Sequence, residues 1–106
     1  MATRTNAETR RFLEKLVGGP LTLGMALRAT REGDEISQAA FARKLSVTRS
    51  YLCDLEQGRK SVSPTQAARF AKTLGFSIEQ YVRLALQDQL SRAHLHFDVE
   101  LRARAA

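Results

Sequence analysis

Two short apolar patterns, separated by only Leu45 to Val47, constrain the fold of this chain more than any other feature. The first begins at Ser37, an N-cap type, and its apolar side chains recur at three- and four-residue spacing, which predicts a short helix. The second begins after Thr48 and ends before Gly58, which suits the left-handed residue beyond a helix end. Because the connection is so short, the two helices must cross steeply and share a small core.

This pattern resembles the helix-turn-helix of the Xre family, the lambda-type repressor and Cro proteins, from Leu21 to about Ile78. The matching residues are Ser37-Gln38, Phe41-Ala42, Leu45, Val47-Thr48, Leu52, Leu55-Glu56 and Gly58. In the turn, this chain has Ser46 where the family usually has glycine, at a position that tends to need a positive φ, and a serine there costs about 1 kcal/mol.

The resemblance implies an all-α, lambda-repressor-like five-helix DNA-binding domain. In the family, an arginine of the helix before the motif pairs with the glutamate that closes the recognition helix. The matching residues in this chain are Arg31 and Glu56. The resemblance therefore implies a structural brace between them; two solvated charges are the alternative.

Three segments follow from the pattern. Residues 1–20 are expected to be an N-terminal helical extension, residues 21–78 the Xre-type domain, and residues 79–106 a C-terminal helix and strand for dimerisation. The extension contains an amphipathic helix over residues 5–17, closed by Gly18-Gly19-Pro20. This helix either packs back on the domain or docks on a second subunit or partner.

Within the domain and after it, further helices are expected over residues 21–32, 64–74 and 78–93. Beyond residue 94 the apolar period changes from that of a helix to two, which predicts a strand. A lone strand leaves its backbone groups unpaired and needs a partner strand, so we expect the same segment of a second subunit to supply it. The expected interface of this homodimer is the apolar row Leu95, Phe97, Val99 and Leu101.

The charge of the chain favours a polyanionic partner. Seventeen Lys and Arg against eleven Asp and Glu give a net charge of +6. The single cysteine, Cys53, cannot form an internal disulfide, and no apolar run is long enough to span a bilayer. These features predict a cytoplasmic protein that binds double-stranded DNA and does not associate with a membrane.

A recognition helix enters the major groove with its N-terminus first, so its early residues meet base edges. The residues expected to read bases are Arg49, Ser50, Cys53 and Asp54. Arg49 is the strongest candidate because a guanidinium can donate to both acceptors of guanine, and Asp54 can accept from cytosine N4. The residues expected to contact phosphate are Gln38, Arg43, Thr48, Tyr51, Arg59 and Lys60. Tyr51 is equally suited to packing.

No constellation of residues suggests catalysis, a cofactor or a bound metal. His94 and His96 share one face of the expected strand, which is more typical of ordinary surface residues than of a metal site. The leading hypothesis is therefore a dimeric, sequence-specific repressor that binds a palindromic operator and is not an enzyme. The alternative is an antitoxin that neutralises a protein toxin and represses its own operon.

Overall fold

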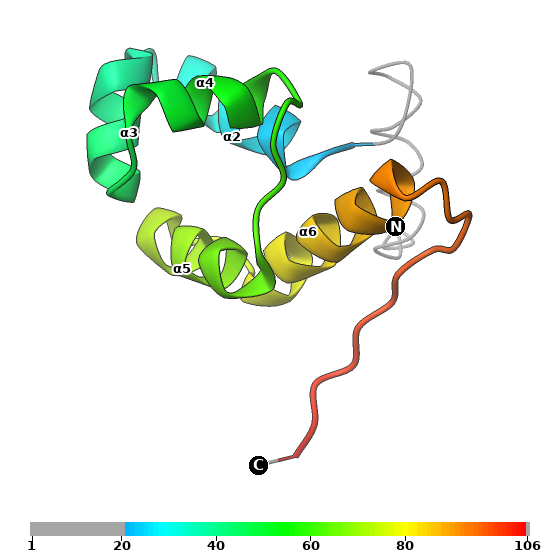
Figure 1. Ribbon diagram of the computed structural model, residues 1–106. Coiled ribbons are helices and arrows are strands. Elements are labelled where there is room, and N and C mark those ends of the chain that lie inside the picture. Colours follow the sequence, from blue (N-terminus) through cyan, green and yellow to red (C-terminus); the bar gives the residue numbers. More distant parts are fainter. Residues whose placement is uncertain (1–20, 106) are drawn as a thin grey trace, which may run out of the picture.

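Five helices, α2 to α6, make up the fold of the computed structural model, which describes residues 21–105 (Figure 1). The helix predicted for residues 5–17 lies outside the described residues. The five helices agree with the all-α fold expected from the sequence, and their bounds are α2 Leu23–Gly33, α3 Gln38–Leu45, α4 Arg49–Glu56, α5 Pro64–Leu74 and α6 Ile78–Arg92.

Each helix starts because a hydroxyl side chain caps its first turn. In every case the hydroxyl oxygen accepts a hydrogen bond from the backbone N–H three residues later, which satisfies a donor that the helix itself leaves unpaired. The capping residues are Thr22, Ser37, Thr48, Ser63 and Ser77. Gly75 ends α5 in the left-handed conformation at φ 75°. The element boundaries are therefore set mainly by local chemistry.

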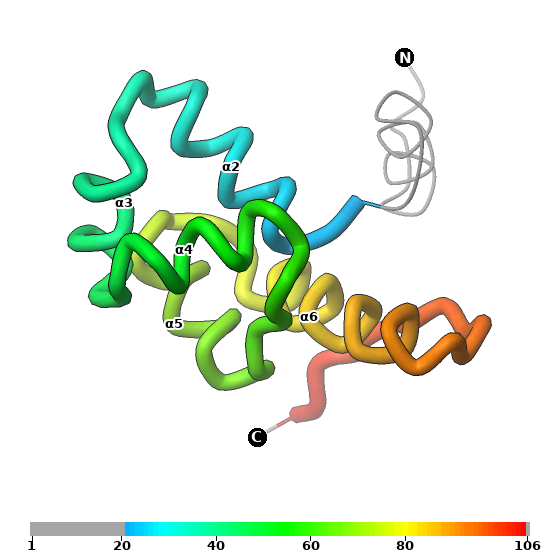
Figure 2. The backbone as a smooth tube through the Cα atoms, turned by 45° about the horizontal axis from the view of Figure 1, so that its top comes forward, coloured from blue at the N-terminus to red at the C-terminus, as the bar shows by residue number. Residues whose placement is uncertain are grey.

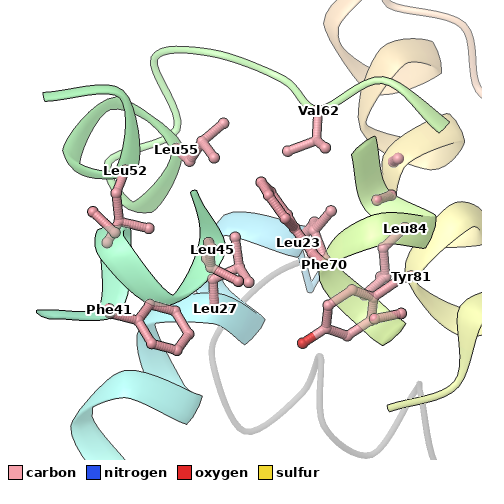
Figure 3. Packing of buried hydrophobic residues seen from close by; sticks show 14 residues of the cluster. Leu23, Leu27, Phe41, Leu45, Leu52, Leu55, Val62, Phe70, Tyr81 and Leu84 are labelled. Carbon is pink, nitrogen blue, oxygen red and sulfur yellow. The ribbon is translucent and has the colours of Figure 1, made fainter. Parts of the chain in front are cut away.

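The core is a single apolar cluster to which all five helices contribute (Figure 3). Figures 1 and 2 show α3 and α4 on one side of the domain and α5 with the start of α6 on the other. Phe41 of α3 and Phe70 of α5 are fully buried, and Val62, in the connection between α4 and α5, is also buried in this cluster. The cluster fixes α4 from behind and leaves the opposite face of α4 outside the core.

The predicted C-terminal dimerising strand is wrong. No strand occurs within residues 21–105; after α6 the chain continues without regular structure and runs away from the helices (Figure 1). The alternating apolar pattern cannot form a ladder because no described segment offers it a partner strand. The four residues of the expected interface are exposed or half-buried on this irregular segment: Leu95, Phe97, Val99 and Leu101.

A side chain of α6, rather than another strand, pairs with this segment. The Gln87 side-chain amide donates to the Phe97 carbonyl oxygen at 2.8 Å, and its own oxygen accepts from the Val99 backbone N–H at 2.8 Å. Tyr81 and Leu84, on the apolar face of α6, are buried within the domain. This face of α6 is therefore covered by the domain itself.

Ser46 occupies the left-handed region, with φ 58° and ψ 43°, between α3 and α4. Because glycine adopts this conformation without strain, we expect Ser46→Gly to raise the free energy of unfolding by up to about 1 kcal/mol. The matched control is Ser50→Gly in α4, where the same change should lower stability by up to about 0.5 kcal/mol. Urea denaturation measures both, and a loss of stability in Ser46→Gly would contradict this account of the turn.

Candidate nucleic-acid interface

The turn between α3 and α4 is held by backbone bonds and by one distant side chain. The Val47 N–H donates to the Ala42 carbonyl at 2.9 Å, and Ala42 is buried where the two helices approach. Arg69 of α5 donates from Nη1 to the Leu45 carbonyl at 2.7 Å, while its guanidinium lies 5.1 Å from the centre of the Phe70 ring. No sequence pattern predicts the role of Arg69, since its contact spans 24 residues of sequence and follows no local spacing.

The four residues predicted to read bases lie on the side of α4 that faces away from the core. Leu52, Leu55 and Glu56 point into the protein and are buried. Arg49 and Ser50 in the first turn are exposed, and Cys53 and Asp54 one turn later are half-buried. Because residues four apart share a helix face, these two pairs form one continuous surface.

At the N-terminal end of α4, Arg49 extends without a hydrogen-bond or charge partner among residues 21–105. The Thr48 hydroxyl oxygen accepts from the Tyr51 N–H at 3.1 Å, so it caps α4 and keeps its own O–H for another acceptor. The first turn of α4 therefore presents a cation and hydroxyl groups to the outside.

At the C-terminal end of α4, Asp54 is paired with two of the predicted phosphate contacts. Its Oδ1 lies 2.8 Å from Arg59 Nε and its Oδ2 lies 3.3 Å from Lys60 Nζ. The hydrogen bond from Arg59, followed by that from Lys60, holds the pKa of the Asp54 carboxyl below its ordinary value. Arg59 Nη2 also lies 3.4 Å from Cys53 Sγ, so this arginine covers the last turn of the helix.

The remaining predicted phosphate contacts are spread around this surface. Tyr51 is half-buried, its hydroxyl lies 3.4 Å from Gln66 Oε1, and Lys60 Nζ stands 5.7 Å from the centre of its ring. Arg43 is exposed in the last turn of α3. Tyr51 thus makes packing and polar contacts within the protein, whereas Arg43 is open to solvent.

Behind α4, Glu56 is the acceptor of a buried polar cluster. Its side chain is only 1% exposed and lies 2.8 Å and 3.0 Å from Arg31 Nε and Nη2, a bidentate pair. The hydrogen bond to Glu56 raises the pKa of Arg31 above its ordinary value, although burial opposes it. Gln38, predicted to contact phosphate, donates its side-chain amide to Glu56 Oε1 at 3.1 Å. The cluster ties the end of α4 to α2 and to the start of α3.

Metal-ligand clusters and membrane-spanning helices are both absent from the described part of the chain. Residues 21–105 contain no group of three or more His, Cys, Asp or Glu side chains placed to hold a metal ion. None of the described helices is long and apolar enough to cross a membrane. His94 and His96 are both exposed in the segment after α6.

Comparison with known proteins agrees with this geometry. A family model described as a helix-turn-helix domain matches residues 22–84, which is more than half of the chain and includes α2 to α5 and the first half of α6. No match was found among curated proteins, and none among solved structures. With α4 exposed on one face, braced behind and preceded by a left-handed turn, the chain belongs to the helix-turn-helix domain family of DNA-binding proteins.

Proposed function

We propose that this protein is a sequence-specific transcriptional regulator of the Xre type, a repressor that binds a palindromic operator with α4 in the major groove. The observation that carries the proposal is the exposed first turn of α4, where Arg49 and Ser50 face outward from a rigid core. A helix presented in this way fits the major groove of B-DNA, and its first residues reach base edges. Arg49 is proposed to read guanine, and Ser50, Cys53 and Asp54 the neighbouring bases.

The proposal predicts a large and local role for Arg49. After selection of a binding site from random double-stranded DNA, Arg49→Ala should weaken binding to that site by about 1 to 3 kcal/mol, roughly 5- to 150-fold, because a bidentate base contact is lost. Preference at one base pair should relax. Fluorescence anisotropy at fixed salt concentration measures both effects.

The matched control is Lys72→Ala, which removes the same charge from an exposed position in the last turn of α5. It should change affinity for the selected site and for random DNA by the same small factor. If Arg49→Ala binds the selected site as tightly as Lys72→Ala does, Arg49 is not part of the base readout.

We further propose that the protein acts as a homodimer. One α4 of eight residues contacts only a few base pairs, so a long operator requires two such helices about one DNA turn, roughly 34 Å, apart. Large apolar side chains remain exposed on the described surface at Phe76, Ile78, Leu95 and Phe97. Sedimentation with a palindromic duplex should show two chains per duplex, and one chain per palindrome would refute the dimer.

A second candidate function is that of an antitoxin, a binding protein that holds a toxin and represses its own operon. The observation that favours it is the irregular segment after α6, where Leu95 and Phe97 are 47% and 66% exposed and could be covered by another protein. Co-expression with the product of the neighbouring open reading frame tests this function. An equimolar complex that Phe97→Ser disrupts would support it, and no complex would count against it. Both candidates are binding proteins, and neither is an enzyme.

A further inference from the structure

The chain reverses direction directly after α4 and brings two cations back over the helix. Gly58 adopts the left-handed conformation at φ 76°, and the Arg59 N–H donates to the Asp54 carbonyl oxygen at 2.8 Å. This turn places the side chains of Arg59 and Lys60 against the outward surface of α4. Two cations that could bind phosphate are therefore already next to a carboxylate of the same surface.

Both carboxylate oxygens of Asp54 are engaged by these cations, one by Arg59 at 2.8 Å and the other by Lys60 at 3.3 Å. The Asp54 side chain is 21% exposed, whereas the cations are 57% and 61% exposed. The cations thus remain accessible to DNA, but their interaction with phosphate competes with Asp54. Two positive charges and one negative charge leave the cluster with a net charge of +1.

We propose that Asp54 is a specificity-determining residue that acts as an internal substitute for DNA phosphate, holding Arg59 and Lys60 until a specific site offers Asp54 a base to contact. The inference rests on the proposed function of α4. On random DNA, any phosphate that draws the two cations away leaves Asp54 without a partner and close to a polyanion. At the specific site, cytosine N4 donates a hydrogen bond to Asp54. The cations can then move to phosphate while Asp54 keeps a partner.

The consequence is selective weakening of non-specific binding. Binding to random DNA depends on the number of phosphates that cations neutralise, and each contact adds about 0.9 to the slope of log K against log salt. Asp54 should remove about one such contact on random DNA and none at the specific site. The carboxylate thereby increases the ratio of specific to random affinity, although it adds negative charge to the interface.

The test is Asp54→Asn in the full chain, titrated with a random-sequence duplex and with the selected site over a range of salt concentrations. Affinity for random DNA should rise roughly 5- to 10-fold at about 0.1 M salt, and the salt slope should steepen by about 0.9. Affinity for the selected site should change less than twofold, because the asparagine oxygen still accepts from cytosine. Arg59→Ala added to Asp54→Asn should remove most of the gain on random DNA.

The matched control is Glu32→Gln, which removes the same charge from another exposed ion pair, that with Arg28 at 2.9 Å on α2. It should raise affinity for random DNA less than twofold. Equal behaviour of Asp54→Asn and Glu32→Gln on random DNA would overturn the inference. Loss of affinity confined to the selected site would also overturn it, because Asp54 would then orient Arg59 for base reading.

Failure of the proposed function would give a different experimental result. A wild-type protein that enriches no sequence from a random library is not a sequence-specific regulator, whatever its affinity for random DNA. The inference about Asp54 fails if the wild-type protein selects a site but Asp54→Asn leaves the ratio of specific to random affinity unchanged. Thermal unfolding of each variant confirms that the comparison is made between folded proteins.

Discussion

Replacement of Arg31 by methionine should lower the free energy of unfolding by about 3 to 5 kcal/mol, because it leaves a buried carboxylate without its charge partner. Glu56 is 1% exposed and receives two hydrogen bonds from Arg31, at 2.8 Å and 3.0 Å. After the substitution, the Gln38 amide would be the one side chain among residues 21–105 that still donates to it. Urea denaturation monitored by circular dichroism measures the loss.

Arg28→Met on the same helix is the control. Arg28 pairs with Glu32 at 2.9 Å, but both side chains are about half exposed, so the control should cost less than about 1 kcal/mol. Glu56→Gln in the Arg31→Met background should recover part of the stability, since the buried charge is then removed. If Arg31→Met is no more destabilising than Arg28→Met, the brace does not stabilise the domain.

Gly24→Ala should lower the free energy of unfolding by about 1 to 3 kcal/mol, even though the same change in an unobstructed helix raises it by about 0.5 to 1 kcal/mol. A Cβ at Gly24 would collide with the Leu55 carbonyl oxygen and lie 2.9 Å from the Leu55 carbonyl carbon. These are backbone atoms, so no rotamer change relieves the contact and α4 itself must shift. Thermal and urea unfolding both report the effect.

Gly33→Ala is the matched control, because it also lies in α2 and a Cβ there would meet no atom within 4 Å. It should be neutral or slightly stabilising. Since the displacement in Gly24→Ala is transmitted to α4, affinity for the selected DNA should also fall in that variant and not in the control. Equal stability of the two variants would show that the contact between α2 and α4 can relax freely.

Local chemistry explains which parts of the fold could be predicted from the sequence. Helix starts follow from a hydroxyl cap and the three- and four-residue apolar spacing, as at Ser37 and Thr48, and both signals lie within one helical turn. The left-handed conformation expected at Ser46 is also present, and that expectation came from the family resemblance, in which glycine usually occupies this position of the turn.

Contacts between distant segments explain the rest. The strand prediction used the period of two after His94, yet a strand exists only when a partner is present, and a sequence pattern cannot supply one. Arg69, which donates to Leu45, and Gly24, which admits the backbone of α4, depend on how helices pack and carry no local signal. The pairing of Asp54 with Arg59 crosses a helix end, where helical spacing rules no longer apply.

The measurement that tests the central claim most directly is a titration of the full ¹⁵N-labelled chain with its selected duplex, followed by backbone amide NMR. If α4 reads DNA, the largest shift changes should fall on Arg49, Ser50 and Cys53, with further changes at Arg59 and Lys60. A random duplex should shift the amides of Arg59 and Lys60 less than the selected duplex does, because Asp54 still pairs with these cations, and should leave the amides of Arg49 and Ser50 nearly unchanged. Changes concentrated on α5 and α6, with α4 unaffected by the selected duplex, would contradict the assignment of α4 as the recognition helix.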